Sequence, residues 1–399
     1  MKEKVLLVDD DAMVLAGLKR QLRNQFSIDT ALSGEEALKQ VLENGPYAVI
    51  VSDFLMPGMN GIEFLSRVKK SNPDTVRMML TGTADMPTAI RAVNEGSIFQ
   101  FHPKPCPADT LCQAIQSAID QYRVVLSNQN QLKDFKSSLA QASVVQQKLM
   151  PKCDPRVDGF DIAGRSVWCD ETGGDYYDFL YPAANGHKRI GIVVGDVTDH
   201  GMPSALLMTT ARAFLRERIQ TPASECAAIV SDVNQRLVQD VEELNLFMTM
   251  FYGEIDIEEK MIRWVKAGHE PAILYTPATG SHELLAGEGL PLGVMEDAVY
   301  KESKKQINSG QIILIGTDGI KGSVDTHGEM FGNERFMDVI RQYADQPARE
   351  MLDRVFESLN DFRHPLGPDD DISNPALAGF HCSLWASLPL GLWRLEYFF

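Results

Sequence analysis

The sequence lacks the features that mark several large classes of protein. Its six cysteines form no C-x-x-C pair, which leaves no structural zinc site and favours a reduced, cytoplasmic setting. No apolar run reaches the ~18 residues of a membrane span, and the N-terminal M-K-E-K-V-L-L-V-D-D-D turns acidic too early for a signal peptide. Clustered Lys and Arg are missing, and the net charge of −17 argues against nucleic acid as a partner. What is present is an ordinary hydrophobic content of 44%, and the 399 residues predict two or three domains.

Residues 1–122 alternate short apolar runs with helical patterns. Each run ends in polar residues: Val5–Val8 before Asp9 and Asp10, Tyr47–Ser52 before Asp53, Val76–Leu80 before Thr81, and Ile98–His102 before Lys104. Such alternation predicts an α/β doubly wound parallel sheet with helices on both faces. Because ligands bind beyond the carboxyl ends of the strands in these sheets, we expect the polar residues to meet at one edge.

The residue types at that edge suit phosphoryl chemistry. Three crowded carboxylates, Asp9, Asp10 and Asp53, repel one another unless a hard cation such as Mg²⁺ neutralises them. A carboxylate held in this way can act as a nucleophile toward a phosphoryl group. The Thr81 hydroxyl and the Lys104 ammonium would then hold the phosphoryl oxygens.

Four motifs in this segment match one family. They are V-D-D-D at 8–11, V-S-D-F-L-M-P-G-M-N-G at 51–61, L-T-G at 80–82 and H-P-K-P at 102–105. Residues 1–122 thus resemble the receiver domain of a two-component response regulator, a flavodoxin-like fold. The resemblance implies Asp53 as the phosphoacceptor and a cognate histidine kinase as the phosphodonor. It also implies a Mg²⁺ site formed by Asp9, Asp10, Asp53 and the Leu55 carbonyl, and switch residues Thr81, Phe101 and Lys104.

Residues 123–150 contain neither Gly nor Pro and carry an apolar repeat. Two series lie seven apart and offset by three: Val125, Leu132 and Leu139, and Phe135, Ala142 and Leu149. This a/d pattern predicts a helical linker that forms a parallel coiled coil in a homodimer. Asn128 and Gln146 interrupt the seam, as polar residues that set the register can. The alternative is a single amphipathic helix lying on the chain's own domains.

Residues 151–375 group strands around paired helices, which predicts an α+β two-sheet sandwich flanked by helices. Aspartates from distant segments end strands or occupy turns there, namely Asp175, Asp196, Asp318 and Asp369–Asp371. Oxygen-only ligands suit two Mg²⁺ or Mn²⁺ ions that share a carboxylate and activate a water for phosphoryl transfer. No G-x-S-x-G motif competes, and Cys169 has no nearby basic partner. His200 and His269 are candidates for proton transfer or phosphate contact, or they are structural.

A second set of motifs matches another family. It comprises V-Q-Q-K-L-M-P (145–151), G-G-D-Y-Y-D-F (173–179), G-D-V-T-D-H-G (195–201), A-G-H (267–269), G-L-P-L-G-V (289–294), T-D-G (317–319) and D-D-D-I-S (369–373). The segment resembles the metal-dependent serine/threonine phosphatases of the PPM (type 2C) class. Within that class it resembles the bacterial sporulation and stress-response branch, which acts on anti-sigma-factor antagonists.

This resemblance implies a site with two Mn²⁺ or Mg²⁺ ions. Asp196 would bridge them, with the Val197 carbonyl, Asp318 and Asp370 as further ligands. Asp175 would hold metal-bound water or contact the substrate phosphate, and His200 is a candidate for the phosphate contact.

Two positions depart from the family's pattern. Asp199 stands where the branch usually has Gly, which adds charge beside the site. After D-D-I-S, Asn374-Pro375-Ala376 is expected to break the last strand of the central sheet, because Pro cannot sit in a central strand. A broken strand would leave Asp370 loosely placed. An atypical apolar tail follows at residues 376–399.

The sequence therefore predicts a receiver domain (1–122), a helical linker (123–150), a phosphatase domain (151–375) and the tail. Our first hypothesis is a response regulator whose phosphorylation at Asp53 controls a protein serine/threonine phosphatase acting on an anti-sigma-factor antagonist. The alternative is a phosphorylation-switched adaptor with an inactive phosphatase fold that binds a signalling partner. The expected break in the last strand favours the adaptor, and the complete set of aspartates disfavours it. A DNA-binding output is disfavoured by the acidic charge.

Overall fold

The computed structural model describes residues 2–82, 98–182, 189–221, 225–241, 244–367 and 370–379. The chain divides into two compact units, Met1–Ser137 and Ser138–Phe399, called unit 1 and unit 2 below. Residues 380–399 of the expected tail lie outside the described part. Among the residues that are described, no helix has both the length and the apolar character needed to cross a bilayer.

Unit 1 is built on a parallel sheet of five strands in the order β2-β1-β3-β4-β5. The strands are β1 (Lys4–Val8), β2 (Ser27–Ala31), β3 (Val49–Asp53), β4 (Val76–Thr81) and β5 (Gln100–Pro103). This confirms the predicted doubly wound sheet. The sequence pattern does not predict β2, because three of the five residues in S-I-D-T-A are polar and no apolar run marks the strand.

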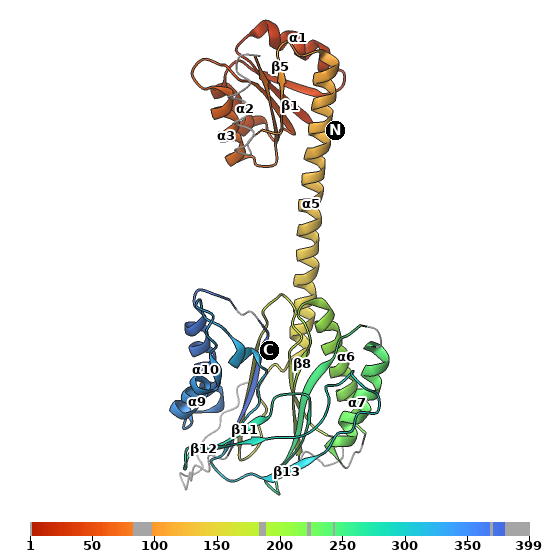
Figure 1. Ribbon diagram of the computed structural model, residues 1–399, viewed down its shortest axis with the longest axis vertical. Coiled ribbons are helices and arrows are strands. Elements are labelled where there is room, and N and C mark those ends of the chain that lie inside the picture. Colours follow the sequence, from red (N-terminus) through yellow and green to blue (C-terminus); the bar gives the residue numbers. More distant parts are fainter. Residues whose placement is uncertain are drawn as a thin grey trace, which may run out of the picture. The chain divides into compact units, whose positions relative to one another are not determined.

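Helices cover both faces of this sheet. α1 (Ala12–Leu22) and the first turns of α5 (Ala108–Leu149) pack on one face, and α2 (Gly34–Asn44) and α3 (Gly61–Ser71) pack on the other. Figure 1 shows α2 and α3 on the opposite side of the strands from α5. Capping side chains start α1 and α3 soon after a strand ends: Asp11 Oδ1 accepts the Met13 N–H at 2.7 Å, and Asn60 Oδ1 accepts the Glu63 N–H at 2.9 Å.

α5 is a single uninterrupted helix of 42 residues that contains almost all of the predicted linker. It begins in unit 1, and the division between the units falls within it, after Ser137. Leu132 and Phe135 of the predicted seam are 55% and 61% exposed in the single chain. Gln146, expected to set the register of the seam, is instead buried within unit 2, so the structure gives it a different role.

Unit 2 contains two antiparallel sheets of five strands, which confirms the predicted sandwich. The first has the order β13-β10-β9-β8-β7 and the second β12-β11-β14-β15-β6. The strands of the first sheet are β7 (Tyr176–Leu180), β8 (Arg189–Val197), β9 (Met248–Asp256), β10 (Met261–Ala267) and β13 (Ser303–Gln306). Those of the second are β6 (Phe160–Val167), β11 (Ala272–Thr276), β12 (Ser281–Leu285), β14 (Ile312–Leu314) and β15 (Ile372–Gly379). Apolar side chains from both sheets, including Ile192, Phe251 and Ile313, fill the space between them.

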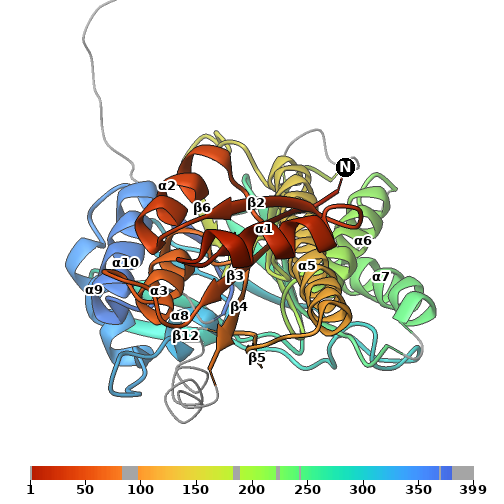
Figure 2. The same cartoon turned by 90° about the horizontal axis from the view of Figure 1, so that it is seen from above.

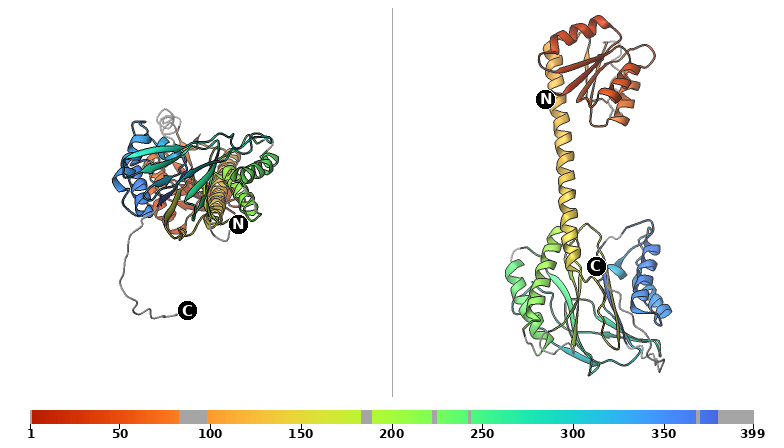
Figure 3. Two further views of the ribbon diagram at one scale, coloured as in Figure 1. Left: turned by 90° about the horizontal axis from the view of Figure 1, so that it is seen from below. Right: turned by 180° about the vertical axis from the view of Figure 1, so that it is seen from behind.

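Paired helices cover the outer faces of the two sheets. α6 (Met202–Arg218) and α7 (Cys226–Val241) pack on the first sheet, and α9 (Gly332–Tyr343) and α10 (Ala348–Arg363) pack on the second. Seen from above in Figure 2 and from behind in Figure 3, the green pair and the blue pair lie on opposite sides of the strands. Each fully buried apolar side chain, such as Met208 or Leu352, contributes about 1.5–3 kcal/mol to this packing. The two sheets and the two helix pairs thus form four packed layers, which fix the positions of the strand ends.

The prediction that Asn374-Pro375-Ala376 breaks the last strand is wrong. β15 continues through these residues and pairs with β6 along its whole length. On its other side, pairing with β14 covers only Ala376 to Ala378. Pro375 lies just outside that ladder, so its missing N–H removes no hydrogen bond from it. Asp370 therefore comes shortly before a strand that is paired on both sides.

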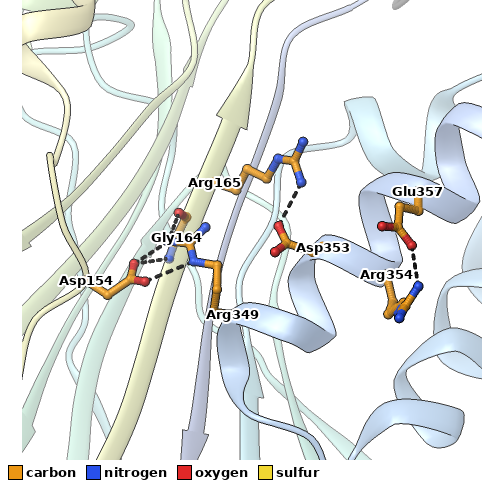
Figure 4. Close-up of polar contacts among 7 residues, drawn as sticks. All are labelled: Asp154, Gly164, Arg165, Arg349, Asp353, Arg354 and Glu357. Carbon is orange, nitrogen blue, oxygen red and sulfur yellow. Dashed lines mark hydrogen bonds and ion pairs between the residues drawn. The ribbon is translucent and has the colours of Figure 1, made fainter.

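Polar contacts join α10 to β6 and to the segment after α5 (Figure 4). Arg349 of α10 binds the Asp154 carboxylate and donates a hydrogen bond of 2.9 Å to the Gly164 carbonyl. Arg165 of β6 pairs with Asp353 of α10 at 2.8 Å. Because β6 pairs with β15, these contacts brace the sheet that leads to Asp370.

Candidate active sites

The first candidate site lies where β1 and β3 end. Asp9, Asp10 and Asp53 each bring a carboxylate oxygen to within 4.8 Å of the others. Asp9 and Asp53 are buried, whereas Asp10 is exposed. Gly61 packs so closely here that a Cβ would lie 2.1 Å from the Asp53 carbonyl oxygen. The structure thus gathers the three predicted carboxylates at one edge of the sheet.

Lys104 bridges two of these carboxylates. Its Nζ lies 2.6 Å from Asp9 Oδ2 and 2.6 Å from Asp53 Oδ1. Burial raises the pKa of Asp53, and the charge of Asp9 adds to the rise, while Lys104 opposes it. Burial also opposes the charge on Lys104, but its hydrogen bonds to Asp53 and Asp9 outweigh burial and raise its pKa. The ammonium therefore stays charged and neutralises part of the cluster.

The remaining predicted residues of this site lie around the same strand ends. Thr81 is buried at the end of β4, where its carbonyl accepts the Lys104 N–H at 2.8 Å and its hydroxyl donates to the Gly82 carbonyl at 3.2 Å. Phe101, in β5, packs partly buried against the core under α2 and α3. Leu55 follows Asp53 by two residues and has a side chain that is 60% exposed.

The second candidate site collects aspartates from four segments of unit 2. Asp175 directly precedes β7, Asp196 lies near the end of β8, Asp318 directly precedes α8 (Gly319–Gly322), and Asp370 comes two residues before β15. Asp175 is buried and Asp196 half-buried, whereas Asp318 and Asp370 are exposed. The site therefore opens to solvent on the side of Asp318 and Asp370.

These aspartates perturb one another strongly. Burial raises the pKa of Asp175 well above its usual range, and the charges of Asp196 and Asp371 raise it further. Burial also raises the pKa of Asp196 to about 7, with the charges of Asp318 and Asp370 adding to the rise and a hydrogen bond with Asp175 opposing it. Such a cluster needs protons or cations to neutralise it.

Asp371 has a part in this site that the sequence does not predict. It is buried, and its Oδ2 accepts the N–H of Gly174 at 2.6 Å and of Asp175 at 3.3 Å. Its Oδ1 accepts the N–H of Cys169 at 2.8 Å. The D-D-D run gives no sign of which carboxylate points inward. Asp371, next to the exposed Asp370, thus binds the backbone of the loop that carries Asp175.

Thr317 and Val197 complete the inner part of the site. The Thr317 hydroxyl donates to Asp175 Oδ2 at 2.8 Å and accepts the Ser373 N–H at 3.0 Å. The other oxygen of Asp175, Oδ1, has no hydrogen-bond partner among the described residues. The Val197 carbonyl faces the Asp175 loop, because a Cβ on Gly174 would lie 3.1 Å from it.

The two histidine candidates differ in their surroundings. His200 is exposed, and its Nδ1 lies 2.6 Å from Asp170 Oδ2, a contact that raises the pKa of His200. His269 is buried against the Thr249 hydroxyl at 2.8 Å, and burial lowers its pKa to about 4. His269 is therefore buried and neutral near pH 7, whereas His200 is exposed beside the Asp170 carboxylate. Asp199, beside it, has φ of +62°, in the left-handed region that favours Gly.

Comparison with protein families agrees with this geometry. The response regulator receiver domain model matches residues 5–116, and the model for stage II sporulation protein E (SpoIIE) matches residues 186–376. The chain thus joins a segment that matches the receiver domain model to a segment that matches the SpoIIE model.

Several known proteins resemble one or the other domain. The phosphoserine phosphatase RsbU of Bacillus subtilis is 26% identical over 57% of this chain and 66% of its own length. RsbP, a phosphoserine phosphatase of the same bacterium, is 28% identical over 50% of this chain and 48% of its own length. The regulator HoxA of Cupriavidus necator is 36% identical over 29% of this chain and 24% of its own length, so this chain spans only part of each relative.

A solved structure supports the fold of the phosphatase domain. The SiaA-PP2C domain of Pseudomonas aeruginosa has a TM-score of 0.54 and is 23% identical, and the match covers 62% of this chain and 98% of that one. This likeness shows the two-sheet PP2C fold of unit 2.

The chemistry of both sites fits divalent cations. In the receiver domain, three carboxylates offer oxygens within 4.8 Å of one another. In the phosphatase domain, Asp175 keeps an unpaired buried oxygen, and the raised pKa of Asp196 marks a surplus of negative charge. Hard oxygen ligands of this kind are those that Mg²⁺ and Mn²⁺ prefer.

Proposed function

We propose that the protein is a response regulator in which phosphorylation of Asp53 controls a metal-dependent protein serine/threonine phosphatase. The observation that carries the proposal is the Asp175–Asp196 pair, whose pKa values are raised by burial and by neighbouring aspartates. Carboxylates crowded in this way oppose folding unless they are neutralised, so they have little structural use. They suit a site that binds hard divalent cations.

In the receiver domain, Asp53 is the proposed phosphoacceptor. Its carboxylate would attack the phosphorus of a phosphohistidine on a cognate histidine kinase, the P–N bond would break, and the phosphoryl group would end on Asp53. Lys104, already 2.6 Å from Asp53, would hold a phosphoryl oxygen together with the Thr81 hydroxyl. Phe101 is proposed to change its packing as part of the switch.

The receiver domain's cation would be Mg²⁺. Asp9, Asp10, Asp53 and the Leu55 carbonyl would hold it, and the bound ion supplies positive charge against the phosphoryl oxygens. Partial neutralisation by Lys104 explains how two of these carboxylates can be buried before a cation binds.

In the phosphatase domain, Asp196, the Val197 carbonyl, Asp318 and Asp370 would hold two Mn²⁺ or Mg²⁺ ions. Bound ions of this kind supply an activated water and polarise the phosphoryl group. Asp175 would orient that water or contact the phosphate through its unpaired Oδ1. The exposed His200, charged more readily because of Asp170, would meet the phosphate anion.

The proposed substrate is a phosphoserine or phosphothreonine on an anti-sigma-factor antagonist. The phosphoserine phosphatases RsbU and RsbP support a phosphoserine substrate, and the motif resemblance supports the antagonist. The free thiols of the described cysteines suit a reducing compartment, and we place the protein in the cytoplasm.

We further propose a homodimer in which α5 forms a parallel coiled coil. Leu132 and Phe135, exposed in the single chain, support it because two such helices would bury these side chains against each other.

The adaptor alternative is less well supported by the structure than by the sequence pattern. Its main argument was a broken last strand, and β15 is continuous and paired on both sides. We retain it only as an outcome of the experiment.

The test is hydrolysis of p-nitrophenyl phosphate by the full chain with Mn²⁺, with and without beryllofluoride as a mimic of phospho-Asp53. Metal-dependent turnover that changes with beryllofluoride is the expected result. The matched controls are Asp53→Asn, which should remove the response to beryllofluoride, and Asp196→Asn, which should remove turnover. If the protein binds beryllofluoride but shows no turnover with or without it, the proposed enzyme activity is refuted and the adaptor alternative remains.

A further inference from the structure

Gln146 is a buried amide in the last turn of α5, with both of its polar groups used. The side chain is 4% exposed. Its Nε2 donates to the Gly173 carbonyl at 2.7 Å, and its Oε1 accepts the Gly173 N–H at 3.1 Å. One side chain thus binds both backbone groups of one residue, as a neighbouring strand would. Gln141, one and a half turns earlier in the helix, is exposed.

Gly173 lies near the end of the loop that joins β6 to β7 and carries Asp175. The next two backbone amides, of Gly174 and Asp175, donate to Asp371 Oδ2. The packing is close, since a Cβ on Gly173 would lie 2.4 Å from that same oxygen. The loop is therefore held on one side by Gln146 and on the other by Asp371, the residue next to Asp370.

The aspartates around this loop repel one another. Asp175, Asp196, Asp370 and Asp371 carry like charges that act on one another, and without restraint the loop would relieve the repulsion by moving away. Two hydrogen bonds to one backbone residue fix both its position and its orientation. Removal of a group that orients a metal site in this way typically lowers metal affinity by about 10- to 100-fold.

We propose that Gln146 is a positioning residue for the phosphatase cation site, through which the end of α5 sets the affinity of the aspartates for divalent cations. The inference rests on the proposed function, because it assigns a further residue to the same site. Gln146 itself touches neither substrate nor cation. A shift of the last turn of α5 by a fraction of an ångström would lengthen both bonds to Gly173 and loosen Asp175 and Asp371 together.

The experiment compares Gln146→Met with Gln141→Met in the full chain. Met is unbranched, similar in length to Gln and a similar helix former, so the change removes the two hydrogen bonds and little else. Mn²⁺ binding is measured by calorimetric titration, and Asp196→Asn identifies the heat that belongs to the receiver domain's own site. We expect Gln146→Met to weaken Mn²⁺ binding by about 10- to 100-fold, as removal of an outer partner does, and Gln141→Met to leave it unchanged.

A purely structural role would lower the melting temperature without changing the Mn²⁺ affinity, so both are measured. Should Gln146→Met fail to fold, Gln146→Asn keeps the amide but shortens its reach, with Gln141→Asn as control, and the same weakening is expected. Folded Gln146 variants that bind Mn²⁺ within about twofold of the wild type, less than 0.5 kcal/mol, overturn the inference.

The outcomes separate this inference from the proposed function. In one outcome, the wild type binds Mn²⁺ but does not hydrolyse p-nitrophenyl phosphate, while Gln146→Met binds Mn²⁺ more weakly. That result supports the positioning role and refutes the phosphatase activity. If the wild type hydrolyses p-nitrophenyl phosphate and Gln146→Met binds Mn²⁺ as tightly as the wild type, only the positioning role is refuted. Absence of Mn²⁺ binding at the phosphatase site of the wild type refutes both.

Discussion

The receiver site and the phosphatase site both crowd carboxylates together, and they neutralise them differently. In the receiver, Lys104 lies 2.6 Å from both Asp9 and Asp53. In the phosphatase, Asp175 and Asp196 face further aspartates, and the pKa of Asp196 rises to about 7. The Lys104 ammonium offsets the negative charge of the receiver site, and bound protons offset that of the phosphatase site.

The difference determines what an incoming metal ion must displace. At the receiver it competes with an ammonium that keeps its charge near neutral pH. At the phosphatase it competes with protons, so binding should release them and tighten as the pH rises through about 7. The comparison predicts a receiver that is stable without metal and a phosphatase domain that depends on it.

The largest effect is expected from Asp196→Asn. It removes the carboxylate at the centre of the phosphatase cluster and should lower kcat for p-nitrophenyl phosphate by at least about 10³-fold. Beryllofluoride binding at the receiver serves as the internal control and should not change. Retention of full activity would sink the proposed mechanism.

The metal-free phosphatase domain should lose stability as the pH rises. Asp196 binds a proton in the folded chain at pH values where the unfolded chain, with a pKa of about 4, has released it. The free energy of unfolding should therefore fall between about pH 4 and pH 7, by up to about 1.4 kcal/mol per unit of pKa difference. Urea unfolding in EDTA measures this slope, and Asp196→Asn should flatten it. An equal slope in that variant would assign the titration elsewhere.

Lys104→Met should affect the receiver in two opposite ways. Loss of the ammonium leaves Asp9 and Asp53 uncompensated and should destabilise the metal-free domain by roughly 1–3 kcal/mol. Mg²⁺ should bind more tightly, because it no longer competes with a fixed cation. Thermal unfolding with and without Mg²⁺ tests both effects, with the exposed Lys70→Met as control. Weaker Mg²⁺ binding would mean that Lys104 helps to build the site.

His200→Ala should give the smallest effect. An exposed charge contributes little, so KM should rise about fivefold or less while kcat changes little. Asp170 raises the pKa of His200, so the difference from wild type should be present at low pH and vanish once the imidazole loses its proton. His327, which is also exposed, provides the matched control His327→Ala. A large fall in kcat would instead make His200 a proton donor.

Local sequence patterns predicted the helices and strands with strong periodicity. They missed strands whose burial or pairing depends on residues that are distant in the sequence. The receiver strands that lead to Asp9 and Asp53 are apolar runs, and α6 and α7 follow clear helical spacing. β7 was not predicted, because its Asp178 is paired with the distant Arg216 and could not be recognised as buried. β15 was expected to break at Pro375, because the sequence does not reveal that one neighbouring ladder begins after it.

The candidate sites show the same limit. The types and spacing of the aspartates identified both clusters, since like residues at strand ends recur in the chain. The pattern could not distinguish Asp370 from Asp371, because three successive aspartates look alike until Asp371 is seen to accept three backbone amides. Gln146 was taken for a seam residue, because its bonds to Gly173 span 27 residues.

The place of β15 has a consequence for the order of synthesis. Among the strands that the structure describes, β6, near the start of the phosphatase domain, is joined to β14 only through β15. Roughly 200 residues separate Val167 from its partner Ile372, which at about 5–20 residues per second takes a ribosome ~10–40 s to make. Until then the second sheet lies in two parts, and Asp370 and Asp371 have not joined Asp175. A nascent chain on the ribosome therefore carries a finished receiver domain well before it has a complete phosphatase site.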